Sequence, residues 1–578
     1  MISIKNTKVT PGAMLLLLIA FFVFLNYASL KNASNPLGKD SLGHMGCAIK
    51  VIRGFNLIAY LENPTWECVR LSIYGYPPLF YLVAAAIRIV FNNVDFMFMT
   101  STIFLILLIY STYKIGQVLE DRKAGLLSAA IVASYPIIYV LSRDFNLDMA
   151  QTAMVCVSLY LLIMTECFKN RKYSILFGLV SGMGMLSKHM FILFIIGPLL
   201  VTLIQLIRTA NNNRNIKMQL INMIIALFIL CLISLRFYYS LYFMPGTIQD
   251  LIRTIGVLST GELNLSPGER MNIHHFLFFL KSLKLYQIGL LNLLIFLFLL
   301  PGFLLKKKYN QYRIFLMIWI ILPIFLLTLR PGKYSEYTVS CLPPFAIITS
   351  LGILSISRRS VRNKLIIIIL LSNIFLNISI VFPKYVDIFW SNNIFNTVFK
   401  YFKVDFAPAS YDSPYNSKMK DPHYKAVKFL TELLKNKKNM IGFINYISAN
   451  WPYERIKWLL LLYNNNVSYD LRNVIQDFVD QDLDIFDFFV FINAPGLTPQ
   501  WLNKDYFLED MENFNQSQRY SHRYPFCILW DGISPKPDDS MAIYQNQLER
   551  IINFYSKVKL VKKINDPRGD ILIYEKMQ

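Results

Sequence analysis

Cysteine is scarce in this chain, and its spacing excludes one common class of metal site. There are seven cysteines in 578 residues and no C-x-x-C pair, so a zinc knuckle is not expected. Cys47 and Cys68 share one loop; a disulfide between them and two separate thiols are both compatible with the sequence. Four more cysteines lie in or beside apolar segments and could pack there as small apolar side chains: Cys156, Cys167, Cys231 and Cys341.

Charged residues are also few, at 16%, whereas hydrophobic residues make up 55% and the mean hydropathy is +0.41. This composition predicts a polytopic membrane protein. The net charge of +22 does not indicate nucleic acid, because no nucleic-acid-binding module accompanies it. The basic residues instead form runs between apolar segments, near 169–172, 306–313 and 358–364. That is the positive-inside pattern, with anionic membrane lipids as partners.

Twelve apolar segments are candidates for membrane helices. The first has no small-residue cleavage site behind it and is interpreted as a retained helix and signal anchor. The segments lie near 11–30, 77–91, 96–118, 124–141, 149–168, 174–190, 191–209, 219–243, 283–305, 311–329, 338–356 and 365–383.

The basic runs give these segments an orientation. If the runs are cytoplasmic, the loops 142–148, 244–282 and 330–337 and the tail face outward. A cytoplasmic amino terminus with an outward tail requires an odd number of crossings. Segment 77–91 is short and begins with Pro77-Pro78, so we expect a partly inserted helix on the outer side and eleven crossings. The alternative is thirteen, with a further crossing within 244–282.

The tail is more polar and predicts a small extracytoplasmic α/β domain. Strands are expected at 440–445 and 488–492, helices at 421–434, 452–462 and 541–555, and a terminal hairpin around 566–569. The predicted architecture is therefore a membrane domain over 1–383, with its first outer loop at 31–76, and an α/β domain over 384–578.

Ionisable residues gather on the expected outer face. Asp40 lies in the first loop, Asp148 ends the second, Lys188 ends a Gly-rich helix, and 330–337 forms a late basic and Tyr-rich element. Fixed cations and tyrosines could hold a phosphate, and a carboxylate could take the proton of an attacking hydroxyl. The pattern favours a reaction between a phosphate-bearing lipid and a second substrate.

Each of these residues also has a structural interpretation. Asp148 stands where a helix N-cap is expected. Lys188 could extend its amine to the membrane interface without binding anything. The element 330–337, with Glu336, could be a solvated loop, and Asp40 could be a turn residue.

Five sequence elements in order resemble the GT-C membrane glycosyltransferases, specifically the glycosyltransferase family 39 and dolichyl-phosphate-mannose protein mannosyltransferase-like group. The resemblance covers Asp40 to about Ile356. The elements are K-D-S-L-G-H-M-G-C-A-I-K-V-I-R-G, Y-P-P-L-F-Y, A-G-L-L-S-A-A-I-V-A-S-Y-P-I-I-Y-V-L-S-R-D-F-N-L-D, G-L-V-S-G-M-G-M-L-S-K and R-P-G-K-Y-S-E-Y-T-V-S-C-L-P-P.

The resemblance implies a reaction and roles for named residues. Asp40 would be the catalytic base in an inverting transfer, with Asp148 as a second carboxylate of the active site. The donor would be a polyprenyl-phosphate sugar, and no metal would be obligatory. Candidates for binding the donor phosphate are Lys188, Arg330, Lys333, Tyr334 and Tyr337, and His44, Tyr76 and Arg143 would shape the site.

Two departures from related patterns are visible. Many members of the group have Asp-Glu where this chain has Asp40-Ser41. Aminoarabinose transferases of lipid A are also similar, but carry Glu-Lys before Pro-Pro where this chain has Gly75-Tyr76.

The sequence thus predicts a glycosyltransferase of a prokaryotic plasma membrane, active on the outer face. Its acceptor could be lipid A, a cell-surface glycan or a protein. The alternative is a transporter or flippase of envelope lipids or glycans. That alternative would require ionisable groups at mid-membrane and inverted repeats, whereas the charges here lie at the helix ends.

Overall fold

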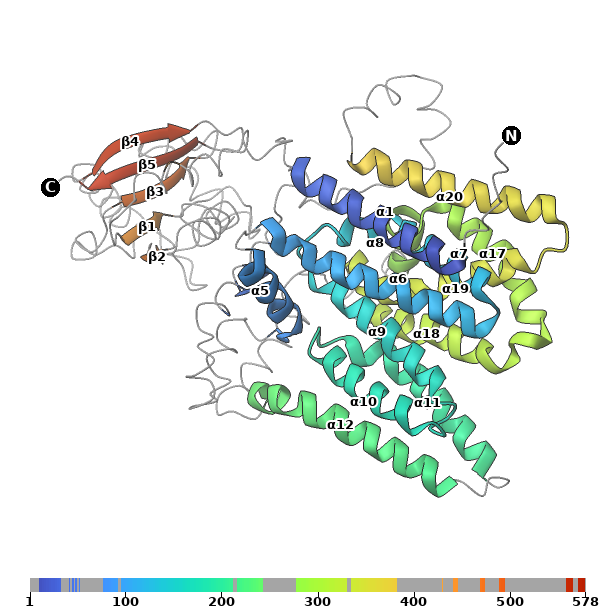
Figure 1. Cartoon of the computed structure of the whole chain (residues 1–578). Coiled ribbons are helices and arrows are strands. Elements are labelled where there is room, and N and C mark those ends of the chain that lie inside the picture. The colour runs from blue at the N-terminus through green and yellow to red at the C-terminus, as the bar shows by residue number, and fades with distance from the viewer. Residues whose placement is uncertain are drawn as a thin grey trace, which may run out of the picture. The chain divides into compact units, whose positions relative to one another are not determined.

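The computed structural model describes residues 10–32, 76–91, 95–210, 216–242, 277–329 and 334–381, isolated residues at 41–51 and 429, and five strands between 440 and 576. The helices between residues 10 and 381 form one bundle (Figure 1). They are α1 (Pro11–Asn32), α5 (Leu79–Phe91), η1 (Asp95–Phe98), α6 (Met99–Leu119), α7 (Arg122–Ser134), α8 (Pro136–Leu141), α9 (Leu147–Met164), α10 (Arg171–Met185), α11 (Phe191–Ala210), α12 (Ile216–Tyr242), α16 (Phe278–Ser282), η2 (Leu283–Gln287), α17 (Leu290–Leu305), η3 (Lys307–Tyr309), α18 (Asn310–Thr328), η4 (Ser335–Cys341), α19 (Leu342–Leu354) and α20 (Arg359–Val381).

Every one of the twelve predicted apolar segments contains a helix, which confirms a polytopic helical membrane protein. Within the described ranges, seven helices are long and apolar enough to span a membrane. Helix α5, with 13 residues, is about 20 Å long and too short to cross a hydrocarbon core of about 30 Å. The total of eleven or thirteen crossings stays a prediction.

Segment 124–141 is broken into α7 and α8 at Pro136. Tyr135 has extended backbone angles (φ −60°, ψ 132°), because a residue before proline is driven out of the helical region. Pro136 then begins α8, where its missing N–H costs no helical hydrogen bond. The break turns the chain toward the loop that carries Asp148.

The polar helix ends divide into two groups, as the basic runs predict. At one end, Lys308 Nζ lies 2.7 Å from Glu120 Oε1, and Gln205 Nε2 donates to the Gln311 carbonyl at 3.4 Å. These contacts join the end of α6 to η3 and the end of α11 to the start of α18. The loop after α8 and the turn after α10 meet elsewhere, at the start of α9. The basic run 306–313 therefore lies at a different group of helix ends from Asp148 and Lys188.

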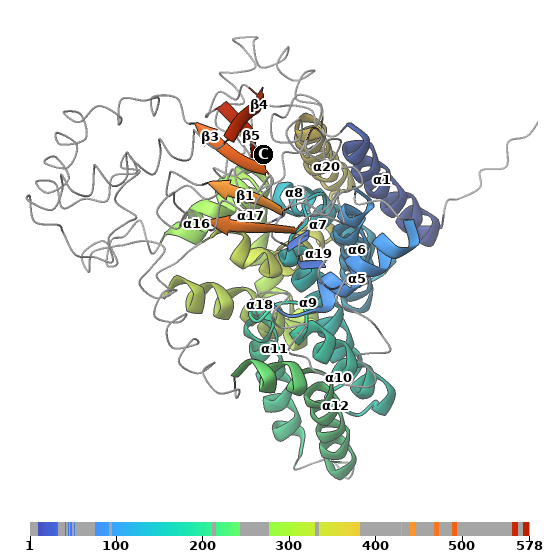
Figure 2. The ribbon, with the colours of Figure 1, turned by 90° about the vertical axis from the view of Figure 1, so that its left-hand side faces the viewer.

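The centre of the bundle is formed by α9 and α19, whose side chains are almost all buried and which both views place among the other helices (Figures 1 and 2). Buried amides join neighbouring helices around this centre. Asn292 on α17 donates to Asn373 on α20 at 2.7 Å, and Asn373 donates to Ser134 on α7 at 3.0 Å. Such side-chain hydrogen bonds hold membrane helices together where burial from lipid gives little driving force.

Helices α10 and α12 approach closely along the Gly-rich face of α10. A Cβ on Gly178 would lie 2.3 Å from the Ala226 carbonyl oxygen, so only glycine fits there. On α12, Ile224, Phe228 and Leu232 are exposed by 60%, 64% and 68% and recur every four residues. This stripe suits contact with lipid.

The described part of the tail is a five-stranded mixed sheet in the order β2-β1-β3-β5-β4. Its strands are β1 (Met440–Ile444), β2 (Ser468–Arg472), β3 (Phe488–Asn493), β4 (Val558–Ile564) and β5 (Asp570–Lys576). β1 runs parallel to β2 and β3, whereas β5 is antiparallel to β3 and β4. The strands predicted at 440–445 and 488–492 and the terminal hairpin are confirmed, and β2 was not expected.

By its contacts the chain divides into two compact units, residues 1–32 with 50–409 and residues 33–49 with 410–578. The predicted boundary at 383 and the helices expected at 421–434, 452–462 and 541–555 fall outside the described residues, except for Phe429, which is helical.

We expect Gly178→Ala to lower the stability of the bundle, because the new methyl group would push α12 away from α10. The expected cost is about 1–3 kcal/mol, as for overpacking elsewhere. Thermal unfolding in detergent would measure it. The matched control is Gly302→Ala, where a Cβ meets nothing within 4 Å; equal behaviour of the two variants would contradict the close packing.

Candidate active site

The site is built around the first turn of α9. Asn146, in extended conformation, is the N-cap, and its Oδ1 accepts a hydrogen bond from the Asp148 backbone N–H at 3.2 Å. The interpretation of Asp148 as the N-cap is therefore wrong. Because Asn146 satisfies the helix end, the Asp148 carboxylate is available for another contact.

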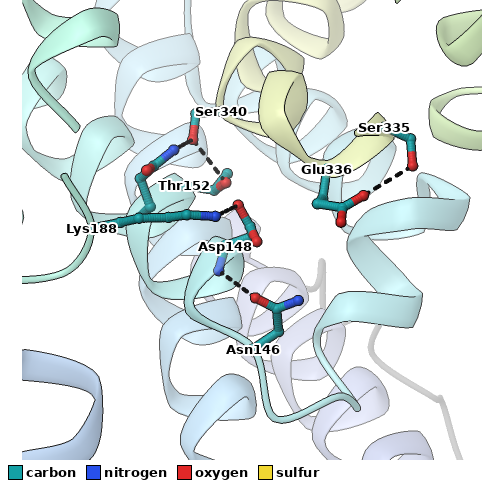
Figure 3. A network of polar contacts seen from close by, with 8 residues as sticks. Asn146, Asp148, Thr152, Lys188, Ser335, Glu336 and Ser340 are labelled. Carbon is teal, nitrogen blue, oxygen red and sulfur yellow. Dashed lines mark hydrogen bonds and ion pairs between the residues drawn. The ribbon is translucent and has the colours of Figure 1, made fainter. Parts of the chain in front are cut away.

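That contact is a buried ion pair. Lys188 Nζ lies 2.6 Å from Asp148 Oδ1, with side chains exposed by 13% and 4% (Figure 3). Lys188 belongs to the turn between α10 and α11, which α5 and α12 support: the Leu79 N–H donates to the Leu186 carbonyl and the Tyr238 hydroxyl to the Met185 carbonyl, both at 2.8 Å. Lys188 therefore does not extend to an interface.

The third element of the site is η4. The Lys188 ammonium lies 5.5 Å from the centre of the Tyr337 ring, within range of a cation–π interaction. The rings of Tyr337 and Tyr334 are in edge contact at 5.2 Å, and Tyr334 is 40% exposed. The row of contacts thus runs from the buried ion pair to the exposed ring of Tyr334.

Glu336 supplies a second carboxyl group to this site. It is half-buried, its Oε2 accepts a hydrogen bond from the Ser335 hydroxyl at 3.1 Å, and it is close enough to interact electrostatically with Asp148 and Lys188. Figure 3 shows its carboxyl group across from Asp148. The interpretation of this residue as part of a solvated loop is wrong.

A layer of hydrogen bonds beneath the two carboxyl groups fixes η4 against α9 and α18. The Ser340 hydroxyl contacts Gln151 Nε2 and the Thr152 hydroxyl, each at 3.0 Å, and the Trp319 indole donates to the Ser340 carbonyl at 2.9 Å. Gln151 and Ser340 follow Asp148 and Glu336 by about one turn. The separation of the two carboxyl groups is therefore set by this layer.

On its other side η4 is held by Gln287, at the end of a π-helical turn. Gln287 Nε2 donates to the Ser335 carbonyl at 2.6 Å and to the Thr338 hydroxyl at 2.7 Å, and the side chain is fully buried. Sequence reasoning missed this residue. The available signal was an amide side chain within the apolar segment 283–305, which is unusual for a membrane helix.

The comparisons with known proteins agree with this picture. Residues 76–236 match the family model described as dolichyl-phosphate-mannose-protein mannosyltransferase. The crystal structure of ArnT from Cupriavidus metallidurans bound to undecaprenyl phosphate is similar with a TM-score of 0.56 at 11% identity, over 96% of this chain and 97% of that chain. The apo structure of that protein gives 0.55 with the same identity and coverage. The chain has the GT-C fold.

Other GT-C structures are more distant. The Archaeoglobus fulgidus oligosaccharyltransferase in its apo form has a TM-score of 0.49 at 12% identity, over 99% of this chain and 89% of that chain. No curated protein sequence matches this chain.

The remaining predicted site residues of this GT-C protein have different surroundings. Arg143 is buried, its guanidinium 4.4 Å from the Tyr139 ring centre and its Nε donating to the Tyr139 carbonyl at 3.4 Å. Tyr76 is 38% exposed and its ring lies 6.3 Å from that of His189, beside Lys188. His44 is half-buried in the second unit. Asp40, Arg330 and Lys333 lie outside the described residues.

A metal site requires three or more ligands close together. Within the residues that the structure describes, no three His, Cys, Asp or Glu side chains form such a group. Because Asp40 lies outside them, the expectation that no metal is obligatory stays a prediction.

We expect Asp148→Asn to destabilise the bundle by about 3 kcal/mol, because it leaves the Lys188 ammonium buried without its counter-ion. Adding Lys188→Met should restore much of that loss, which thermal unfolding of the single and double variants in detergent would measure. Lys308→Met is the control, since its ion pair with Glu120 is exposed and should contribute less than about 1 kcal/mol. If the losses of stability in Asp148→Asn and Lys188→Met simply added in the double variant, the ion pair would be contradicted.

Proposed function

We propose that this protein is a glycosyltransferase that moves a sugar from a polyprenyl-phosphate donor to a hydroxyl group, with inversion, on the outer face of a prokaryotic plasma membrane. The observation that supports it most is the Lys188 ammonium, held between Asp148 and the Tyr337 ring at one end of the helices. A fixed cation at the membrane boundary suits a lipid phosphate. The GT-C fold is shared with an ArnT structure that holds undecaprenyl phosphate.

The ion pair suggests how the donor would be held. Lys188 is kept in place by Asp148, and the phosphate would bind to the ammonium together with the hydroxyls of Tyr334 and Tyr337. Fixed donors of this kind stabilise the negative charge that builds on a leaving phosphate. Arg330 and Lys333 precede these tyrosines in sequence and are proposed as further phosphate ligands.

This arrangement assigns different tasks to the two aspartates. Asp148 is engaged by a cation, so its proposed task is to position Lys188. The proton of the acceptor hydroxyl would then go to Asp40, and the oxygen would attack the anomeric carbon as the lipid phosphate leaves. Sugar and acceptor, whether lipid A, a cell-surface glycan or a protein, are to be identified by experiment.

We expect Asp40→Asn to lower sugar transfer at least about 100-fold, the usual contribution of a general base, without loss of folded protein. The assay is transfer of radiolabelled sugar from a panel of polyprenyl-phosphate sugars in membranes containing each variant. Asp121→Asn, the same chemical change at the N-cap of α7, where asparagine caps as well as aspartate, is the control.

Two outcomes would overturn the proposal. If wild-type membranes consume no donor, the protein is not a transferase for these lipids. If labelled lipid instead changes leaflet without transfer, the flippase alternative replaces it. Unchanged transfer by Asp40→Asn would remove Asp40 as the base.

A further inference from the structure

Glu336 is the ionisable group of the site to which the proposed function gives no task. Asp148 has Lys188 as its partner, whereas no cation lies within ion-pair distance of Glu336 among the described residues. Its carboxyl group receives hydrogen bonds from the Ser335 hydroxyl and from its own backbone. A carboxylate offers about four acceptor positions, so Glu336 retains capacity for a ligand.

The local structure does not require a carboxyl group here. Gln287 holds the Ser335 carbonyl and the Thr338 hydroxyl, and Gln151 and Thr152 hold Ser340. These contacts fix both ends of the short helix without Glu336. Placing a second carboxyl group near Asp148 in a half-buried position is unfavourable in itself, so an apolar or amide side chain would make a more stable protein. Such a cost is typical of residues that serve function.

The charge of Glu336 identifies the part of the ligand that it can contact. A phosphate and a carboxylate repel each other, so the phosphate belongs on the Lys188 and Tyr337 side of the site. A sugar attached to that phosphate carries hydroxyl groups, which donate hydrogen bonds to carboxylate oxygens. The contacts that hold η4 keep the Glu336 carboxyl group at a fixed place for such donors.

We propose that Glu336 recognises the sugar of the donor by accepting hydrogen bonds from its hydroxyl groups, while Lys188 holds the phosphate. This inference rests on the proposed function and adds to it the residue that distinguishes a sugar-bearing lipid phosphate from the bare lipid phosphate. Glu336 is thus a specificity-determining residue of the site.

The test compares binding of two probes to the full-length protein in detergent: a polyprenyl-phosphate sugar found to bind the wild type, and undecaprenyl phosphate without sugar. In Glu336→Gln, one acceptor oxygen becomes an amide donor. Its affinity for the sugar-bearing lipid should fall about 10- to 100-fold, as for loss of a charged hydrogen bond, with the bare phosphate unaffected. Lys188→Met should weaken both. Ser335→Ala, which keeps the carboxyl group, is the matched control.

A series of deoxy-sugar donors distinguishes recognition of the sugar from a merely structural role, because only recognition makes the effect of Glu336→Gln on affinity depend on which hydroxyl the donor lacks. For the donor that lacks the contacted hydroxyl, wild type and Glu336→Gln should bind equally well. An equal loss for both lipids, or no loss with any donor, would overturn the inference. The inference would also be overturned if the wild type bound Mg²⁺ or Mn²⁺ and Glu336→Gln did not, because Glu336 would then be a cation ligand.

These results separate the two proposals. If the wild type binds and transfers sugar while Glu336→Gln behaves like the wild type, only the inference about Glu336 fails. If the wild type binds no sugar-bearing lipid at all, the proposed function fails and the inference fails with it.

Discussion

A buried cation needs a counter-ion, and in this bundle that requirement joins the elements of the site. Lys188 comes from the turn after α10 and Asp148 from the first turn of α9, and their ion pair is almost fully buried. At low dielectric either charge alone would be strongly unfavourable, so the two elements must remain together. The N-cap Asn146 makes this possible, because it satisfies the helix end that would otherwise compete for the Asp148 carboxylate.

Hydrogen bonds of neutral side chains extend the same constraint to the rest of the bundle. Ser340 joins η4 to α9, Gln287 joins it to the π-helical turn, and Asn373 joins α20 to α17 and α7. Apolar contacts alone do not specify register between membrane helices, since lipid is as apolar as leucine. Polar contacts at defined positions do, and here they surround the residues to which we assign binding of the donor.

Hydropathy was sufficient to predict the helices but not the way they end. All twelve apolar segments contain helices, because a chain in lipid must satisfy its backbone internally. The break at Pro136 and the late start of α5 after Pro77-Pro78 are local backbone effects, so the prolines in the sequence indicate both. Strand β2 was missed, since its sequence S-Y-D-L-R lacks the apolar run that identified β1 and β3.

For the site, the order of motifs indicated Asp148, Lys188 and Tyr337 as members, whereas tertiary structure decided their partners. A sequence cannot show that Lys188 and Asp148, forty residues apart, meet at 2.6 Å, because that depends on how three helices pack. The same packing places Glu336 in the site and buries Gln287. Composition and periodicity determined that the chain is a helical membrane protein, since these depend on local chemistry. Only the fold decided which charged groups lie together, because those contacts arise between distant segments.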